Sequence, residues 1–363
     1  MKMKMTSLIS AAACAIVALA ATAKETETPV LRIYTWADYV SPEVVEGFEK
    51  SANCRVEIDT FDSNETMFEQ IKAGKKDCDI IMPSSYLVEL MAEEGLVVEL
   101  DHSKIPNVRK NFDKRFAKLI LDPSFRYNAP YAVTYTGLMY DKGKVPTGTD
   151  VTSWSILDNP AFKDRITLLD DQREVIGAAL IALGYSINTK KPEEISAAAE
   201  CARRWRRNIL KFDVEGYKAS IASGETWIAH AYSTDAMQVI HGNRRQGVAP
   251  RPDLAFVLPK EGFVIAFDEM VISAHSQNPD LAHAFIDYLY RGDVAKANME
   301  FIIGLMPVKP GIDSLGKELS DMIMLDAETV KRGEVLGSFE DDPKTFDLYN
   351  NAWTKIKLPL EAK

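Results

Sequence analysis

The stretch that decides the fold runs from residue 31 to residue 94 and reads LRIYTWADYVSPEVVEGFEKSANCRVEIDTFDSNETMFEQIKAGKKDCDIIMPSSYLVELMAEE. Strand-like apolar segments alternate in it with segments that have the apolar spacing of a helix. We predict strands at 31–36, 55–60 and 79–83 and helices at 42–50, 64–73 and 86–94. Ser41 is a natural N-cap, and Pro42 suits the first helical position. Three alternations within about sixty residues indicate a parallel sheet covered by helices.

The same pattern restarts in the second half of the chain. Here we predict strands at 165–169, 227–232 and 254–258 and a helix at 174–183. Two α/β lobes fit a chain of 363 residues better than one very large sheet. Ordered strands near 131–140 and 270–273 are expected to join them. Lobe one then comprises residues 31–132 with about 270–310, and lobe two comprises about 133–269 with 311–358.

The N-terminus has the features of a secretory signal peptide. Lys2 and Lys4 precede a short alanine-rich run that ends in Ala21-Thr22-Ala23. We therefore predict that residues 1–23 are removed and that the protein is exported to the periplasm. A buried alanine-rich helix is one alternative. Lipid attachment at Cys14 is another, less favoured because the residues after it remain apolar.

Composition excludes several classes of protein. The chain is 46% apolar and carries 43 Lys plus Arg against 53 Asp plus Glu, a net charge of -10. Such a chain is no disordered segment, and it favours cationic partners over nucleic acid. The basic cluster at 203–207 is interpreted as the solvated face of a helix.

Signatures of enzymes and metal sites are missing. The sequence has no G-x-S-x-G, H-E-x-x-H, Walker A or G-x-G-x-x-G pattern. Its five histidines are scattered, and no two cysteines form C-x-x-C, so we predict neither a metal site nor a cofactor. Cys54, Cys78 and Cys201 are expected to be free and buried, with one disulfide as the alternative.

Acidic residues at the turn after the strand at 165–169 allow two interpretations. Asp171 can cap the following helix while Glu174 reaches back to it, as in a capping box. Alternatively, the two carboxylates face a cleft. Loops at the carboxyl ends of parallel strands bind ligands, and Trp36 to Tyr39 and Ser84 to Tyr86 lie in such loops.

Six segments together resemble the spermidine/putrescine-binding proteins of bacterial ABC uptake systems. They occur in the order of that family and span roughly residues 31 to 355. The segments are YTWADYVSPEVVEGFEK, TFDSNETMFEQIKAG, DIIMPSSYLVELMAEEGL, LLDDQREVIGAALIALGYSINT, LPKEGFVIAFDEMVISAHS and RGDVAKANMEFIIG.

The resemblance implies a type II periplasmic binding fold with two lobes, which closes on a ligand held between them. It also implies a monomer without cofactor that delivers a polyamine to a membrane permease driven by a cytoplasmic ATPase. Carboxylates would bind the ammonium ends, and aromatic faces would cover the methylenes and cations.

Site residues follow from the same resemblance. The corresponding positions are Trp36, Ala37, Asp38, Tyr39, Ser84, Ser85, Tyr86, Asp171, Glu174, Tyr232, Asp235 and Asp268. Among them, Ala37 stands where the family often has a small polar residue, and Tyr232 stands where it has a tryptophan. Three further positions depart from the family pattern, because Ala266 and Leu305 replace aromatic residues and Leu336 replaces a glutamine. Since the acids are kept and part of the aromatic wall is lost, the ligand is expected to be bulkier or differently shaped than putrescine.

Two alternatives remain open. In the first alternative, the ligand is another cationic or amino-bearing solute. A ligand with a carboxylate would need an arginine in the cleft to bind it, and Arg173 is the nearest candidate. The more distant alternative is a hydrolase with Asp171 and Glu174 as an acid–base pair. Those residues lie three apart at one helix start, a poor geometry for attacking opposite faces of a substrate.

Overall fold

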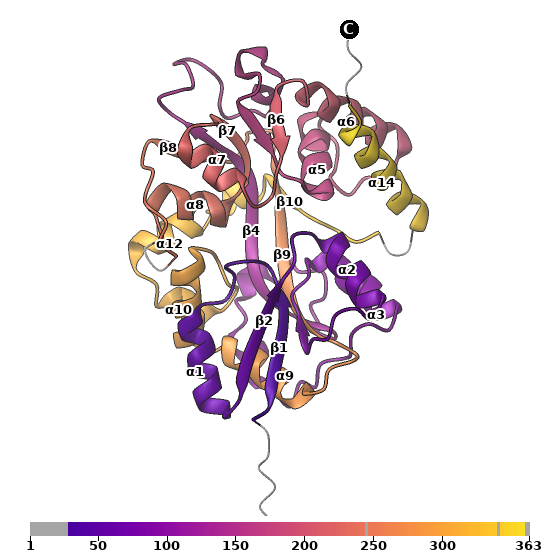
Figure 1. The fold of residues 1–363 in the computed structure, drawn as a ribbon, viewed down its shortest axis with the longest axis vertical. Helices are drawn as coiled ribbons and strands as arrows, with labels where there is room; N and C mark the ends of the chain where they lie inside the picture. Colours follow the sequence, from indigo (N-terminus) through magenta and orange to yellow (C-terminus); the bar gives the residue numbers. More distant parts are fainter. Residues whose placement is uncertain (1–27, 244–245, 340–341, 360–363) are drawn as a thin grey trace, which may run out of the picture.

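Two long strands form the spine of the computed structural model, which describes residues 28–243, 246–339 and 342–359. These strands, β4 (Asn128–Asp141) and β9 (Phe263–Ile272), are antiparallel and buried along almost their whole length. Figure 1 shows them running from the lower half of the molecule into the upper half. The predicted crossing strands are therefore confirmed, although β9 begins seven residues earlier than expected. Asp268 and Glu269 interrupt its apolar run in the sequence yet lie within the strand.

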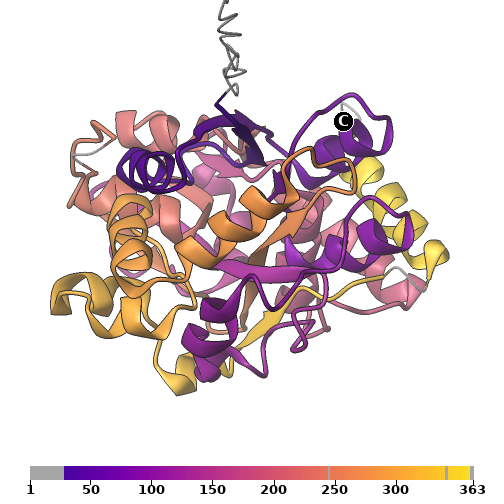
Figure 2. The ribbon, with the colours of Figure 1, turned by 90° about the horizontal axis from the view of Figure 1, so that it is seen from below.

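The lower half, lobe one, contains the parallel sheet predicted from residues 31–94. Strand β1 (Val30–Thr35) pairs in parallel with β2 (Arg55–Thr60) and with β3 (Ile80–Ile81), and β3 lies antiparallel to β9. Beyond the short regular part of β3, Asp79 and Met82 still donate backbone hydrogen bonds to β1. The covering helices are α1 (Pro42–Ala52), α2 (Asn64–Lys72), α3 (Val88–Glu93), α4 (Pro106–Asn111), α9 (Pro279–Leu289) and α10 (Gly292–Ile302). The view from below shows α1 lying beside α10 (Figure 2).

The upper half, lobe two, repeats this plan. Strand β5 (Ile166–Leu168) pairs in parallel with β6 (Ile209–Phe212) and β7 (Ile228–Tyr232), whereas β7 and β8 (Leu254–Val257) are antiparallel to β4. Its helices are α5 (Gln172–Ala182), α6 (Pro192–Trp205), α7 (Tyr217–Ser223), α8 (Ser233–His241) and α14 (Pro343–Lys357). Helix α5 is buried on every side, because α6 and α14 pack against it.

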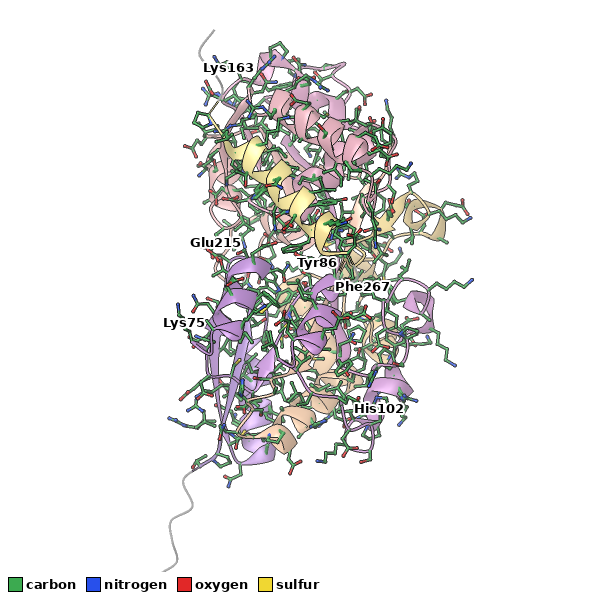
Figure 3. The ribbon with its side chains drawn as sticks, turned by 90° about the vertical axis from the view of Figure 1, so that its right-hand side faces the viewer. Lys75, Tyr86, His102, Lys163, Glu215 and Phe267 are labelled. Carbon is green, nitrogen blue, oxygen red and sulfur yellow. The ribbon has the colours of Figure 1, made fainter. Side chains whose placement is uncertain are left out.

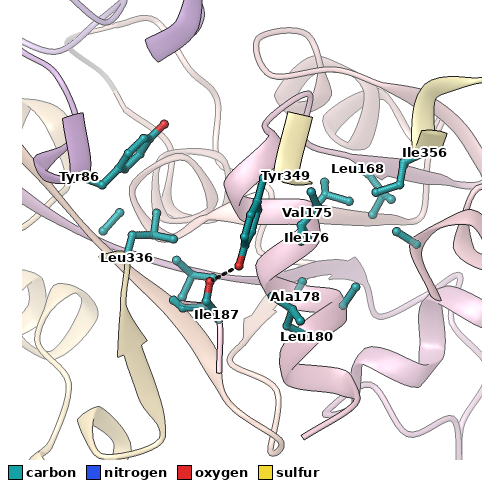
Figure 4. Close-up of a cluster of buried hydrophobic side chains, with 14 of the residues drawn as sticks. Tyr86, Leu168, Val175, Ile176, Ala178, Leu180, Ile187, Leu336, Tyr349 and Ile356 are labelled. Atoms are coloured by element: carbon teal, nitrogen blue, oxygen red, sulfur yellow. Dashed lines mark hydrogen bonds between the residues drawn. The ribbon is translucent and has the colours of Figure 1, made fainter. Parts of the chain in front are cut away.

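The chain returns from lobe one to lobe two through a C-terminal series of short elements. These are α11 (Lys309–Asp313), α12 (Lys317–Ile323), α13 (Ala327–Val330) and β10 (Gly333–Val335). Strand β10 pairs in parallel with β9, and Leu336 follows it directly. A single buried cluster contains Tyr86 of lobe one together with Leu336 and Tyr349 of lobe two (Figure 4). Apolar packing thus continues from one lobe to the other.

The basic segment at 203–207 has a structural role. Arg206 and Arg203 donate hydrogen bonds to the backbone carbonyls of Leu358 and Lys355 at the end of α14, and Arg204 pairs with Asp158. Arg203 and Arg206 therefore attach the end of α14 to α6, while Arg204 and Arg207 are exposed, in keeping with the predicted solvated face.

The three cysteines after Cys14 are free and buried. Within the described residues, no helix is both long and apolar enough to cross a membrane. The predicted signal peptide and Cys14 lie outside the residues that the structure describes.

Candidate ligand-binding site

A cleft of about 290 Å³ lies where the two lobes meet. Loops at the carboxyl ends of β1, β2, β3, β5, β6 and β7 all contribute to it, as expected for ligand sites of parallel sheets. Figure 3 shows Tyr86 of lobe one and Glu215 of lobe two near the level where the lobes meet. Every predicted site residue except Ser85 and Leu305 lines the cleft, and so does Leu336.

Aromatic residues form the wall on the side of lobe one. Asp38 has a φ of 56°, in the left-handed region that aspartate tolerates better than most residues. Trp36, two residues earlier, packs edge-on against Phe61 with ring centroids 4.4 Å apart, and its indole Nε1 has no hydrogen-bond partner in the part of the chain that the structure describes. The backbone of Tyr39 is fixed by Tyr131, whose hydroxyl donates a hydrogen bond to the Tyr39 carbonyl.

Asp268 lies on β9 at the centre of the cleft. The Tyr39 hydroxyl donates to its Oδ2 at 2.5 Å, and the Ser84 hydroxyl donates to its Oδ1 at 2.8 Å. Ser84 is itself fixed by Asn64, whose side chain bonds both its backbone N–H and its hydroxyl. Burial, with a smaller effect of the Asp171 charge, raises the pKa of Asp268 to about 6 against the lowering effect of these two hydroxyl bonds. The carboxylate is thus precisely oriented but poorly stabilised in its charged form.

Asp171 and Glu174 lie together at the start of α5. Asp171 is the N-cap, as predicted: its Oδ1 accepts the Glu174 backbone N–H at 3.1 Å, and its Oδ2 accepts the Tyr232 hydroxyl at 3.0 Å. The Glu174 side chain lines the cleft, and its Oε2 is buried without a hydrogen-bond partner among the described residues. Burial raises the pKa of both carboxyls, and the Asp171 charge raises that of Glu174 further. The capping and the cleft interpretations of Asp171 therefore hold together.

The guanidinium of Arg173 does not line the cleft, although its charge has a lowering effect on the pKa of both Asp171 and Glu174. Its guanidinium donates to the Gly337 carbonyl at 3.1 Å and to Asn188 Oδ1 at 3.2 Å. It also lies 4.2 Å from the ring centroid of Phe339, and the rings of Tyr86 and Tyr349 complete the enclosure. The suggestion that Arg173 binds a ligand carboxylate is wrong, because its charged end is used inside the protein.

Comparison with known proteins identifies the family. Residues 43–324 match the model of the bacterial extracellular solute-binding proteins. This chain belongs to that family. Two relatives are a putrescine/cadaverine-binding protein of Pseudomonas aeruginosa, 31% identical over 94% of this chain and 97% of its own, and a spermidine/putrescine-binding periplasmic protein of Salmonella typhimurium, 32% identical over 94% and 96%. The solved structure of a putative spermidine/putrescine ABC transporter from Listeria monocytogenes superposes with a TM-score of 0.83, at 32% identity over 91% of this chain and 99% of that one.

The family assignment settles what kind of protein this is. It is a binding protein with the two-lobed fold of its relatives and not an enzyme, so the hydrolase alternative is wrong. The resemblance read from the six sequence segments is confirmed.

Leu305 lies away from the cleft of this binding protein. It is 1% exposed and lines a second cavity of about 370 Å³ together with Val133 and Tyr135. Its carbonyl accepts the Val133 N–H at 2.8 Å. Side chains of a strand alternate between its faces, so Thr134 faces the cleft while its two neighbours face the second cavity. Ala266, which pairs with Thr134, lies on the cleft side.

Several lining residues were not found by sequence reasoning. They are Phe61, Asp62, Thr134, Val214, Glu215, Lys218, Thr234, Gln238 and Ile302. Val214, Glu215 and Lys218 follow strand β6, which was not predicted because only one of its four residues is buried. The rule that ligands bind at carboxyl ends of parallel strands would have located this corner had β6 been recognised.

Proposed function

We propose that this solute-binding protein captures a polyamine, putrescine or spermidine, in the periplasm and delivers it to the membrane permease of an ABC importer with its cytoplasmic ATPase. The observation that carries the proposal is the convergence of Asp171, Glu174 and Asp268 on one cleft, where Arg173 is turned away. The printed names of the relatives from Pseudomonas aeruginosa and Salmonella typhimurium support it.

Electrostatics explains why an amine would bind here. Three carboxylates in a protein-enclosed cleft repel one another, and burial raises their pKa values. An ammonium group relieves this repulsion and forms charge-assisted hydrogen bonds, which are roughly twice as strong as neutral ones. The unpartnered Glu174 Oε2 provides an acceptor for it. Trp36, Tyr39 and Tyr232 add aromatic faces on which cations and methylenes can pack.

The proposal extends to the organisation of the chain. The ligand contacts are drawn from the predicted residues that line the cleft, and Ser85 and Leu305 are left out. We also propose that lobe one comprises residues 31–132 with about 270–310 and lobe two about 133–269 with 311–358, so that β4 and β9 form the hinge. We further propose that the protein acts as a monomer and binds no nucleic acid, in keeping with its net charge of -10.

Mass spectrometry of the ligand that the purified protein carries tests the proposal. Protein from cells grown in rich medium is denatured, and the released small molecules are identified against a mock purification. We expect a near-stoichiometric amount of putrescine, spermidine or a close relative of them. A stoichiometric ligand without an amino group would overturn the proposal.

A further inference from the structure

One of the carboxylates in the cleft already has a cation beside it. Lys218, on α7, lines the cleft, and its Nζ lies 3.2 Å from Oδ1 of Asp235 on α8. The Tyr217 hydroxyl donates to the other oxygen, Oδ2, at 2.8 Å. Both oxygens of Asp235 therefore have partners from within the chain. The two charged side chains are 29% and 18% exposed, so the pair is only partly open to solvent.

The other carboxylates of the cleft differ from Asp235. Asp171 and Asp268 accept hydrogen bonds from uncharged donors, namely hydroxyls and one backbone N–H. Among the described residues, Glu174 keeps a buried oxygen, Oε2, without a hydrogen-bond partner. The cleft thus has one acidic region, where no cation among the described residues contacts the carboxylates and Arg173 acts on them only through its charge, and a second region, at Asp235, where the protein supplies an ammonium group.

Lys218 does not turn this second region into an anion site. Burial lowers the pKa of Lys218, but the charges of Asp235, Asp38 and Glu215 raise it above its usual value, so the ammonium stays charged. Three acidic residues against one lysine leave the region around Lys218 with a negative net charge, and Asp38 and Glu215 also line the cleft. A ligand carboxylate would be repelled there, and a second ligand ammonium would have to displace or bypass Lys218.

We propose that Lys218 determines ligand specificity, by placing the protein's own ammonium group where the second amino group of a diamine would otherwise bind Asp235. This inference rests on the proposed function. Recognition then depends mainly on one ammonium group, held by Asp171, Glu174 and Asp268. The remainder of the ligand is recognised by its shape and by apolar contacts with Ala266 and Leu336, both of which line the cleft.

Comparing a diamine with a monoamine of the same carbon chain isolates this effect. Putrescine and 1-aminobutane are titrated into the full-length mature protein by calorimetry, and the ratio of their dissociation constants is measured. The variant Lys218→Met releases Asp235, and Lys218→Gln removes the charge while keeping a donor. Lys218→Arg keeps both the charge and the pairing. Lys211→Met is the matched control, since Lys211 pairs with Asp213 at 2.8 Å on the same lobe but does not line the cleft.

We expect the preference for putrescine over 1-aminobutane to rise at least about tenfold in Lys218→Met and Lys218→Gln, because a close charge pair across an interface is worth that much or more. Lys218→Arg and Lys211→Met should keep the wild-type ratio. Thermal melts followed by circular dichroism verify that each variant is folded. Binding of both amines with an unchanged ratio in the two uncharged variants overturns the role of Lys218 while leaving the proposed function intact. Spermidine is titrated alongside, and failure of the wild type to bind any of the three amines overturns the proposed function, and this inference with it.

Discussion

Replacing Asp268 with asparagine should separate ligand affinity from stability. The substitution keeps the shape of the side chain and removes its charge, while the Tyr39 and Ser84 hydroxyls remain around it. Truncating one partner of a buried, hydrogen-bonded charge pair costs about 2–5 kcal/mol of binding. Since every 1.4 kcal/mol is a factor of ten, the dissociation constant for putrescine or spermidine should rise about 30- to 4,000-fold.

The free energy of unfolding should respond in the opposite sense. The pKa of Asp268 is about 6 in the folded protein, above its usual value of 3.8, so its ionised form is disfavoured by folding. The stability that this carboxyl contributes at low pH is lost as the pH rises through about 6. At pH 7 the neutral asparagine avoids this loss, up to about 3 kcal/mol, partly offset by weaker hydroxyl bonds. The unliganded variant should therefore melt no lower than the wild type.

Calorimetry of both polyamines at pH 7.5, with thermal melts of ligand-free protein, tests both statements. Asp62→Asn is the matched control, because Asp62 also lines the cleft but is exposed, so its loss should weaken binding by less than about 1 kcal/mol. Wild-type affinity also should fall as the pH drops below about 6, where Asp268 is protonated. Unchanged affinity in Asp268→Asn, or equal losses in both variants, would refute the reasoning.

Three further predictions concern the wall, the hinge and the core. Ala266→Trp should fill part of the cleft and shift the preference towards short, unbranched diamines; an identical ranking of a ligand panel would show that Ala266 does not shape the site. Ligand should lower the radius of gyration in solution scattering and change the fluorescence of Trp36, and Trp36→Leu should lose most of the fluorescence change but keep the compaction. Shifting the equilibrium between open and closed lobes from 1:99 to 99:1 needs about 5.5 kcal/mol, and micromolar binding supplies about 8 kcal/mol. Tight binding with an unchanged scattering curve would therefore contradict lobe closure. Burial raises the pKa of Glu269 to about 8, so the free energy of unfolding of the wild type should fall by up to about 3 kcal/mol between pH 6 and pH 9. An equal loss in Glu269→Gln would contradict this assignment.

Local patterns in the sequence located the parts of the cleft that follow β1, β3 and β5, whereas Tyr232, Asp235, Ala266 and Asp268 were assigned only from the family resemblance. In lobe one, strands and helices alternate with strong periodicity, so the loops after β1 and β3 could be assigned to a ligand-binding edge. Asp171 was correctly predicted as a helix cap because capping depends on neighbours within one turn of the chain. Such features depend on residues that are close in sequence.

The failures involve contacts between residues far apart in the sequence. Leu305 faces the second cavity because its backbone pairs with Val133, more than 170 residues earlier, and no local pattern reveals that pairing. The long side chain of Arg173 turns towards Phe339 instead of the cleft for the same reason. Lys218 was missed because strand β6 before it is mostly accessible and lacks a strong apolar pattern.

A crystal structure of the protein with spermidine tests the central claim most directly, because the two cavities give clearly different positions for the ligand. The account predicts spermidine in the cleft between the lobes, with a terminal ammonium within about 2.7–3.2 Å of carboxylate oxygens of Asp268, Glu174 or Asp171. Spermidine bound instead in the cavity beside Leu305, or in the cleft with its ammonium groups away from all three carboxylates, would contradict it.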